Sequence, residues 1–314
     1  MPPKITILGS LNIDLTARVP HHPLPGETLT ASSFTVSPGG KGANQAVACA
    51  KLSRSSGVDT NPTALISMVG AVGADSYGEL LRSNLQKHGV DVSGVEVKGD
   101  QKTGIAMIIV DEPTGENRIV LSAEANHSFG VEQVGALMAA VGRVELLVLQ
   151  LEIPVGVVVG VIQEARREGV EVLFNPAPAV VMPKEVYEGL GHLVVNETEA
   201  ALLGGVGVDV LDTEAGCEGV ARGFVERGVK NVVITLGGRG VYYMGGGKKG
   251  LVAAEKAKVV DTTAAGDTFV GMYALGVVGG GFDIEETVKR ANKAAAKTVQ
   301  RKGAQDSIPW RDEL

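Results

Sequence analysis

The chain of 314 residues is 44% hydrophobic and 21% charged, with 43 glycines, 4% aromatic residues and a formal net charge of −7. The apolar content excludes a disordered chain, and the acidic balance argues against a broad nucleic-acid or anionic-membrane surface, which needs clustered Lys and Arg. A glycine excess in a folded chain indicates many tight turns and places where backbone approaches a ligand closely. We therefore expect a soluble α/β protein with a small-molecule site, and neither a nucleic-acid nor a membrane partner.

The sequence shows few of the features that direct a protein out of the cytoplasm. Cys49 and Cys217 are the only cysteines, so no disulfide framework is expected. The first 15 residues have too short an apolar run and too early an acid for a signal peptide. The most apolar stretch, residues 144–162, is interrupted by polar residues and Pro154, which argues against a transmembrane helix. The sequence thus predicts a cytoplasmic protein, with the nucleus as an additional compartment.

Short apolar runs alternate along the chain with longer amphipathic stretches. The apolar runs predict strands at residues 4–8, 64–69, 146–149, 170–174, 193–195 and 231–235. The amphipathic stretches predict helices at residues 43–51, 76–88, 131–141, 155–168 and 213–226. This alternation predicts one α/β domain over residues 1–314, with a doubly wound, mostly parallel sheet flanked by helices. Ligands of such sheets bind at the carboxyl ends of the strands.

Two regions break this rhythm. Residues 13–36 hold short β segments around PHHPLPGET, and residues 103–122 are typical of a hairpin with a turn at PTGEN. Together they predict a small sheet inserted at about residues 13–38 and 100–124. It is either an elongated edge of the main sheet or a lid over the site, and the pattern alone leaves both open. Residues 53–62 predict a surface loop.

Two glycine-rich segments lie in the last third of the chain. GGGKKG, residues 245–250, matches the dinucleotide pattern G-x-G-x-x-G, but no helix follows it, so we expect a hairpin turn. TLGGRG, residues 235–240, follows an apolar strand. Its backbone amides are suited to a nucleotide phosphate, although a plain turn between two strands explains it equally well.

The segment SPGGKGANQAVACAKL, residues 37–52, places glycines directly before an Ala-rich helix. Gly39 and Gly40 allow the backbone to approach a ligand, and Lys41 and Asn44 can donate several hydrogen bonds to hydroxyl groups. Ordinary capping of the helix by a glycine loop is the alternative.

The segment DTTAAGDTFVG, residues 261–271, is the most informative. We expect Asp261 to end an apolar strand and a helix to begin at about Asp267. A helix N-terminus preceded by small residues is a ready anion site. Asp267 there is suited to act as general base for a hydroxyl nucleophile, or it is an ordinary acid of a first helical turn.

Together, GGKGANQA and DTTAAGDTF resemble the two signature segments of the ribokinase (phosphofructokinase-B-like) family of carbohydrate kinases. LNID, PGET, LQLEIP, NPAPA, NETEA, ITLGGRG and RKGAQDSIPW also occur in family order across the chain. The resemblance implies a ribokinase-like α/β fold whose small β-sheet is a lid and a homodimer interface. It also implies transfer of the ATP γ-phosphoryl group to the primary 5-hydroxyl of D-ribose.

By this resemblance, Asp267 is the general base, and the backbone amides of Ala264, Ala265 and Gly266 form an anion hole. Sugar binding is carried over to Asn12, Asp14, Gly40, Lys41, Asn44, Glu152 and Asp267. ATP binding is carried over to Asn196, Thr235, Gly237, Gly240, Gly266 and Asn292. Glu199 is expected to organise Mg²⁺ through water. A monovalent cation, K⁺, is expected at Asp261, Thr263, Thr298, Arg301, Gly303 and Ser307, mostly through backbone carbonyls.

Three alternatives stay open at this point. A kinase for fructose, adenosine, deoxyribose or a sugar acid shares the signatures, although Asn12 and Asp14 with GGKGANQ favour a furanose pentose. An NAD-dependent oxidoreductase fits the βαβ pattern but lacks the strand–GxGxxG–helix unit. A non-catalytic sugar-binding protein is the third alternative, and the presence of Asp267 argues against it.

Overall fold

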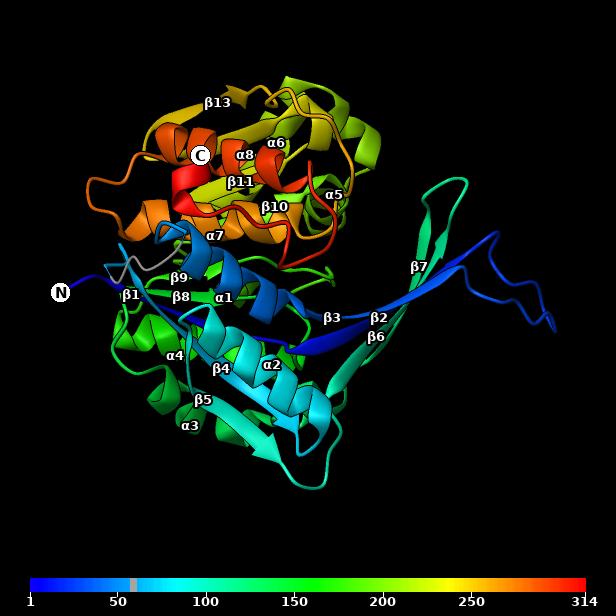
Figure 1. The fold of residues 1–314 in the computed structure, drawn as a ribbon. Helices are drawn as coiled ribbons and strands as arrows, with labels where there is room; N and C mark the ends of the chain where they lie inside the picture. Colours follow the sequence, from blue (N-terminus) through cyan, green and yellow to red (C-terminus); the bar gives the residue numbers. More distant parts are fainter. Residues whose placement is uncertain (57–60) are drawn as a thin grey trace.

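The computed structural model describes residues 1–56 and 61–314. Within them the main sheet has nine strands, in the spatial order β13-β12-β11-β10-β9-β8-β1-β4-β5 (Figure 1). They are β1 (Lys4–Leu8), β4 (Leu65–Gly73), β5 (Asp91–Lys98), β8 (Leu146–Leu149), β9 (Val172–Phe174), β10 (His192–Asn196), β11 (Asn231–Thr235), β12 (Val241–Gly245) and β13 (Lys248–Val252). The strands from β5 to β11 are parallel, whereas β12 and β13 add an antiparallel edge.

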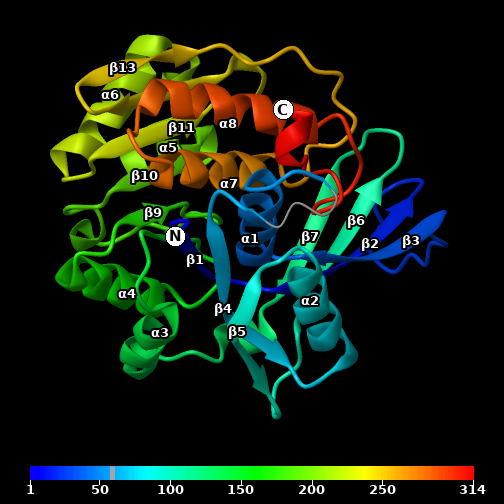
Figure 2. The same ribbon diagram turned by 60° about the vertical axis from the view of Figure 1, so that its left-hand side comes forward.

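Helices cover both faces of this sheet (Figures 1 and 2). One face carries α1 (Lys41–Leu52), α2 (Ser76–Lys87), α7 (Ala265–Val278) and α8 (Ile284–Thr298), and the other α3 (Val134–Val141), α4 (Val155–Glu168), α5 (Glu197–Gly204) and α6 (Glu214–Glu226). Short 3-10 helices are η1 (Glu124–His127), η2 (Val131–Gln133), η3 (Lys184–Val186), η4 (Val208–Asp212), η5 (Gly237–Arg239) and η6 (Arg311–Glu313). None of the described helices is long and apolar enough to cross a membrane.

The strand β8 shows why the apolar runs form this sheet. All four of its residues are buried. Leu146 and Val148 belong to the core beneath α1, α7 and α8, whereas Leu147 and Leu149 belong to the core on the opposite face. Side chains of a strand alternate between faces, so a strand buried on both faces is apolar at every position.

A second, four-stranded sheet projects from one side of the α/β body (Figure 1). It is formed in the order β3-β2-β6-β7 by β2 (Asn12–Val19), β3 (Ser33–Gly39), β6 (Gly104–Asp111) and β7 (Asn117–Ser122). The strands β6 and β7 form the hairpin expected around PTGEN. The alternative of an elongated edge of the main sheet is wrong, because these strands pair only among themselves within the described residues.

The predicted doubly wound fold with a small separate sheet is confirmed. Strands 4–8, 146–149 and 231–235 and helix 155–168 have the predicted bounds, and GGGKKG forms the predicted hairpin turn. The segment predicted as a helix at 131–141 begins as the 3-10 helix η2. The surface loop predicted at 53–62 includes residues 57–60, which lie outside the described residues.

The prediction that Asp261 ends a strand is wrong. The residues after β13 run without regular structure to α7, and Val259 and Val260 are 63% and 46% exposed. The end of this segment pairs with the end of α8 instead of with a strand, since the amides of Val260 and Asp261 both donate to the oxygen of Val299. The helix that follows begins at Ala265 rather than at Asp267.

Candidate active site

In the glycine-rich segment before α1, the backbone packs closely against the backbone of residues 10–12. Gly40 has φ +87°, and a Cβ atom there would lie 2.6 Å from the backbone nitrogen of Asn12. A Cβ at Gly39 would overlap the carboxylate of Asp14, a side-chain end that would have to turn away. Gly40 therefore needs to be glycine, and the two positions place the start of α1 beside the base of the small sheet.

Glu152, which follows β8, links these segments. Its Oε2 atom accepts hydrogen bonds from the Ser10 hydroxyl at 2.6 Å and from the backbone amide of Lys41 at 3.0 Å. Asn12 Nδ2 lies 3.4 Å from the same oxygen. The structure thus gathers four of the residues predicted to bind the sugar, namely Asn12, Gly40, Lys41 and Glu152. Ser10 was not predicted as a site residue, because its contact with Glu152 joins segments more than a hundred residues apart.

Asp14 lies in an electronegative environment. Burial and the negative charges of Glu152 and Asp267 raise the pKa of Asp14 to about 7, although Lys41 opposes the shift. The carboxyl group therefore changes protonation near neutral pH. When protonated, the carboxyl group can donate a hydrogen bond. When ionised, it can only accept hydrogen bonds.

Lys41 stays cationic among these acids. Burial by itself lowers the pKa of Lys41, but the charges of Asp267, Glu152, Glu199 and Asp14 outweigh burial and raise the pKa above its usual value. The ammonium group therefore supplies positive charge where the predicted sugar and phosphate subsites meet.

Asp267 lies in the first turn of α7 and is 8% exposed. Its Oδ2 atom accepts from Asn44 Nδ2 at 3.1 Å, and its Oδ1 atom accepts from Gln45 Nε2 at 3.0 Å. Both donors come from α1, which packs directly on α7. The two signature segments, more than 200 residues apart, therefore meet at this carboxylate. Gln45 was missed as a site residue, although it stands inside the GGKGANQA signature.

The N-terminus of α7 is built for an anion. Ala264 is its N-cap residue and has φ +59°, a left-handed conformation that is rare for a residue with a side chain. No side chain caps the helix. The amide of Ala265 donates to the carbonyl of Thr262 at 3.3 Å, and no described side chain accepts from the amide of Gly266. Such amides, together with the helix dipole, attract negative charge.

The residues predicted to bind ATP lie at the neighbouring strand ends. Asn196 and Thr235 are register partners at the carboxyl ends of β10 and β11. Gly240 and Asn292 both contact the chain after β13: a Cβ at Gly240 would lie 2.8 Å from the nitrogen of Ala254, and Asn292 Nδ2 donates to the oxygen of Ala253 at 2.8 Å. Gly237, at the start of η5, has open space around it.

Glu199 is held by the cap of α5. Its Oε2 atom accepts from the amide of Asn196, whose side chain accepts from the amide of Glu199, both at 2.8 Å. Burial raises the pKa of Glu199 despite the Asn196 amide and Lys41. Among the described residues, no three His, Cys, Asp or Glu side chains are grouped to hold a metal. A single carboxylate fits Mg²⁺ that keeps its water and is shared with phosphates.

The two segments predicted to hold a monovalent cation lie together. Asp261 accepts from the amide and hydroxyl of Thr263 at 2.9 and 2.6 Å and from the amide of Gly303 at 3.0 Å. Burial alone raises the pKa of Asp261, but these hydrogen bonds outweigh it and lower the pKa. The amide of Asp261 donates to the oxygen of Val299.

The remaining predicted cation residues belong to the same loop or its base. Thr298, at the end of α8, donates to the hydroxyl of Thr268 at 2.9 Å, which ties the loop to α7. Ser307 donates to the oxygen of Ala304 at 2.7 Å. The guanidinium of Arg301 pairs with Glu313. Because a guanidinium has no acceptor atom, Arg301 can ligate a cation only through its backbone carbonyl.

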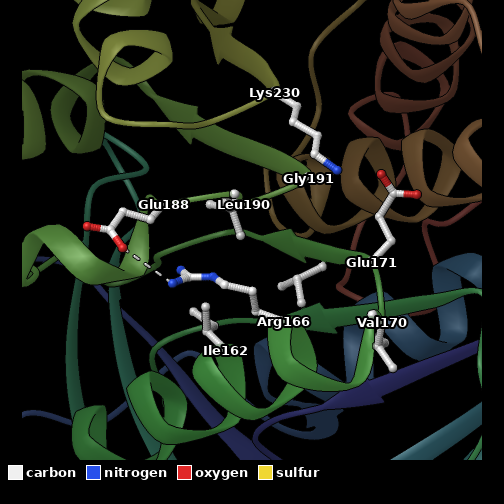
Figure 3. Close-up of a pocket in the computed structure, with 11 residues that line it drawn as sticks. Ile162, Arg166, Val170, Glu171, Glu188, Leu190, Gly191 and Lys230 are labelled. Carbon is white, nitrogen blue, oxygen red and sulfur yellow. Dashed lines mark ion pairs between the residues drawn. The ribbon is translucent and has the colours of Figure 1, made fainter.

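A cavity of about 280 Å³ lies elsewhere, at the amino ends of β9 and β10 (Figure 3). Its lining includes Arg166, Glu171, Glu188 and Lys230, and Arg166 pairs with Glu188. None of the residues predicted for sugar, nucleotide or cation lines this cavity. It is therefore separate from the candidate active site.

Comparisons with known proteins agree with this geometry. The sequence model described as "pfkB family carbohydrate kinase" matches residues 2–311. Ribokinase of Schizosaccharomyces pombe is 44% identical over 98% of this chain and 95% of its own length. The crystal structure of ribokinase from Thermotoga maritima has a TM-score of 0.84 and 37% identity, covering 99% of this chain and 97% of that one.

A further solved structure is ribokinase of Arabidopsis thaliana complexed with ribose and ATP. It has a TM-score of 0.85 and 30% identity, and the match covers 99% of this chain and 97% of that one. Since the family match spans nearly the whole chain, and the fold and both signature segments agree with it, this chain belongs to the pfkB family of carbohydrate kinases.

Proposed function

We propose that this chain catalyses the ATP-dependent phosphorylation of D-ribose at its 5-hydroxyl, giving ribose 5-phosphate and ADP. The observation that carries the proposal is the Asp267 carboxylate, which lies in the uncapped first turn of α7 beside the segment around Lys41. Full-length similarity to proteins named ribokinase supports it, as does the similar fold of the Arabidopsis protein that binds ribose and ATP.

In this proposal Asp267 accepts the proton of the 5-hydroxyl as that oxygen attacks the γ-phosphorus of ATP. A positioned base contributes about 10²–10⁴-fold. The amides of Ala264, Ala265 and Gly266 stabilise the negative charge on the transferred group, and Lys41 adds a fixed positive charge. Phosphoryl transfer depends mainly on positioning and charge stabilisation, which a helix N-terminus supplies.

The sugar is held by groups at the base of the small sheet. Asn12, Asp14 and Glu152 offer amide and carboxyl partners, while Gly40, Lys41 and Asn44 offer donors from the start of α1. Asn12, Asn44 and Asp267 are at most 8% exposed, so a bound pentose would exchange its water for these groups. Hydroxyl groups both donate and accept, which matches this mixed set.

ATP occupies the carboxyl ends of β10 and β11 in this proposal, at Asn196, Thr235, Gly237, Gly240, Gly266 and Asn292. When bound, Mg²⁺ neutralises phosphate charge, and Glu199 holds it through water. A monovalent cation such as K⁺ would order the loop before α7. It would be held mainly through backbone carbonyls, at Asp261, Thr263, Thr298, Arg301, Gly303 and Ser307.

The small sheet serves as lid and homodimer interface in this proposal. Val36, Leu15, Met107 and Val120 lie opposite one another across its four strands. Val36, Met107 and Val120 are 45%, 46% and 60% exposed, and a contiguous apolar row of this kind favours burial against a second copy. We place the enzyme in the cytoplasm, the compartment expected from its sequence.

The direct test is an ADP-release assay with ribose, 2-deoxyribose, fructose and adenosine as acceptors, each with and without K⁺ and Mg²⁺. We expect ribose to give the highest kcat/KM, no turnover without Mg²⁺, and faster turnover with K⁺. A higher kcat/KM for another acceptor would replace ribose by that acceptor. ATP-independent ribose binding with no turnover would instead favour the non-catalytic alternative.

A further inference from the structure

Asp267 is held by a chain of buried amide side chains. Asn44 and Gln45 each donate one hydrogen bond to its carboxylate. A carboxamide has an oxygen and a nitrogen of almost the same shape, so either end fits the same space. Only the nitrogen end stabilises a carboxylate, because two oxygen acceptors facing each other repel. Something must therefore fix which end of each amide points at Asp267.

Gln305 fixes the orientation of Asn44. It is 4% exposed, and its Nε2 atom donates to Asn44 Oδ1 at 3.0 Å. Gln305 is itself oriented by Asn84, whose Nδ2 donates to Gln305 Oε1 at 2.6 Å. Donors and acceptors therefore alternate from Asn84 through Gln305 and Asn44 to the carboxylate, and reversing one amide breaks the chain.

Gln150 orients Gln45, but unlike Gln305 it has no described hydrogen-bond partner at its own Oε1 atom. It is fully buried, and its Nε2 donates to Gln45 Oε1 at 2.6 Å. This leaves Gln45 Nε2 to donate both to Asp267 Oδ1 and to Asn175 Oδ1, each at 3.0 Å. The two chains approach the carboxylate separately, one at each oxygen.

We propose that Gln305 and Gln150 are positioning residues for this base, acting through Asn44 and Gln45. The inference rests on the proposed role of Asp267 as general base. Neither glutamine contacts Asp267 by a described hydrogen bond, so each acts only by keeping an amide nitrogen on the carboxylate. Correct placement of the base matters in the reaction because a small misalignment slows proton transfer.

The test uses Gln305→Met and Gln150→Met, which keep the side-chain length and remove both polar ends. Gln163→Met is the matched control, since Gln163 is exposed on α4, which covers the face of the main sheet opposite to α1 and α7. We expect kcat with ribose to fall roughly tenfold in each of the two variants, as for the loss of one hydrogen bond, with KM for ATP unchanged. The control should keep wild-type kcat.

The same substitutions are then made in the Asp267→Asn background. There the carboxylate is already gone, so we expect them to change the residual kcat less than about twofold. An equal loss in both backgrounds, or wild-type kcat in both single variants, would overturn the positioning role. Melting temperatures identify a variant that does not fold, and Gln→Glu at the same position, which preserves shape, then replaces it. A wild-type protein inactive on ribose would instead overturn the proposed function.

Discussion

Asp14 shows how single residues give this site its pH dependence. Its carboxyl group is confined against Gly39 and lies near Glu152 and Asp267. The pKa of about 7 means that the folded protein keeps a proton on Asp14 that the unfolded chain releases near pH 4. Asp14 therefore favours folding at low pH, and this contribution is lost as the pH rises through about 7.

Asp14→Asn tests this assignment. The amide cannot ionise, so the variant should gain stability relative to wild type as the pH rises from 4 to 8. Each unit of pKa shift corresponds to about 1.4 kcal/mol. The measurement is the difference in melting temperature between variant and wild type at pH 5 and pH 8, which we expect to be more favourable to the variant at pH 8. Asp100→Asn, at an exposed position, is the control. A pH-independent difference would contradict the assignment.

Gly39→Ala tests the close approach between the glycine segment and Asp14. The added Cβ overlaps the Asp14 carboxylate, so that side chain must move out of the sugar subsite. We expect KM for ribose to rise at least about tenfold, the equivalent of one strong hydrogen bond, with KM for ATP little changed. Gly99→Ala is the control, because a Cβ there meets no atom within 4 Å. Equal KM values for both variants would argue against Asp14 as a sugar ligand.

Among elements, the N-terminus of α7 depends most on local backbone geometry. Ala264 holds φ +59° where the chain turns into the helix, and no side chain caps the first turn. This conformation costs a residue with a side chain about 1–2 kcal/mol, and a β-branched side chain tolerates it least. The element is therefore strained where the proposed anion hole lies, as is common at functional sites.

Ala264→Gly and Ala264→Val should therefore differ. Glycine adopts the same φ without strain, so we expect kcat and melting temperature close to wild type. Valine should lower the stability by about 1–2 kcal/mol and reduce kcat, because the amides of Ala265 and Gly266 move with the turn. Thermal melts and steady-state kinetics on both variants check this. A valine variant with wild-type kcat would show that the turn does not carry the anion hole.

The elements that the sequence predicted correctly are those with a strong periodic pattern. β8 and α4 match their predicted bounds because one is apolar throughout and the other strictly amphipathic. β5 alternates weakly, with exposed residues at Asp91, Ser93 and Glu96, and it was not predicted. The apolar residues near Val259 were misread as a strand, since pattern alone does not reveal whether a partner strand exists.

Site residues, like strands, could be predicted only where the sequence itself carries a recognisable pattern. Signature segments identified Asp267, Lys41 and Asn44 by family resemblance, and the fold brings them together. Ser10, Gln45 and Gln305 were missed, because their roles arise from contacts between distant parts of the chain. Such residues carry no pattern of their own until the helices α1 and α7 are packed.

At the scale of the whole molecule, the small sheet is joined to the α/β body at the proposed sugar subsite. Asn126, in η1, is buried, and its Nδ2 donates to Asn12 Oδ1 at 2.7 Å and to the oxygen of Leu11 at 3.1 Å. Gly104, at the start of β6, must be small because its Cβ would overlap Asn12 Oδ1. Movement of the small sheet would therefore displace Asn12 and Asp14 directly.

Val120→Asp tests the small sheet as a dimer interface. A charge in the exposed apolar row of Val36, Met107 and Val120 should separate the two copies, because a buried unpaired carboxylate is costly. We expect a dimer for wild type and a monomer for the variant by light scattering. Val131→Asp is the matched control, since Val131 is similarly exposed at 63% but lies outside the small sheet. A dimeric Val120→Asp variant would place the interface elsewhere.

The proposed phosphorylation of ribose depends on Asp267 as the base. The most direct measurement is ribose-dependent ADP formation by the wild-type protein and by Asp267→Asn, with ribose affinity of both measured by calorimetry. We predict robust turnover for wild type, and for the variant a kcat lower by at least about a hundredfold with ribose binding retained. Near-wild-type turnover by Asp267→Asn would show that Asp267 is not the base.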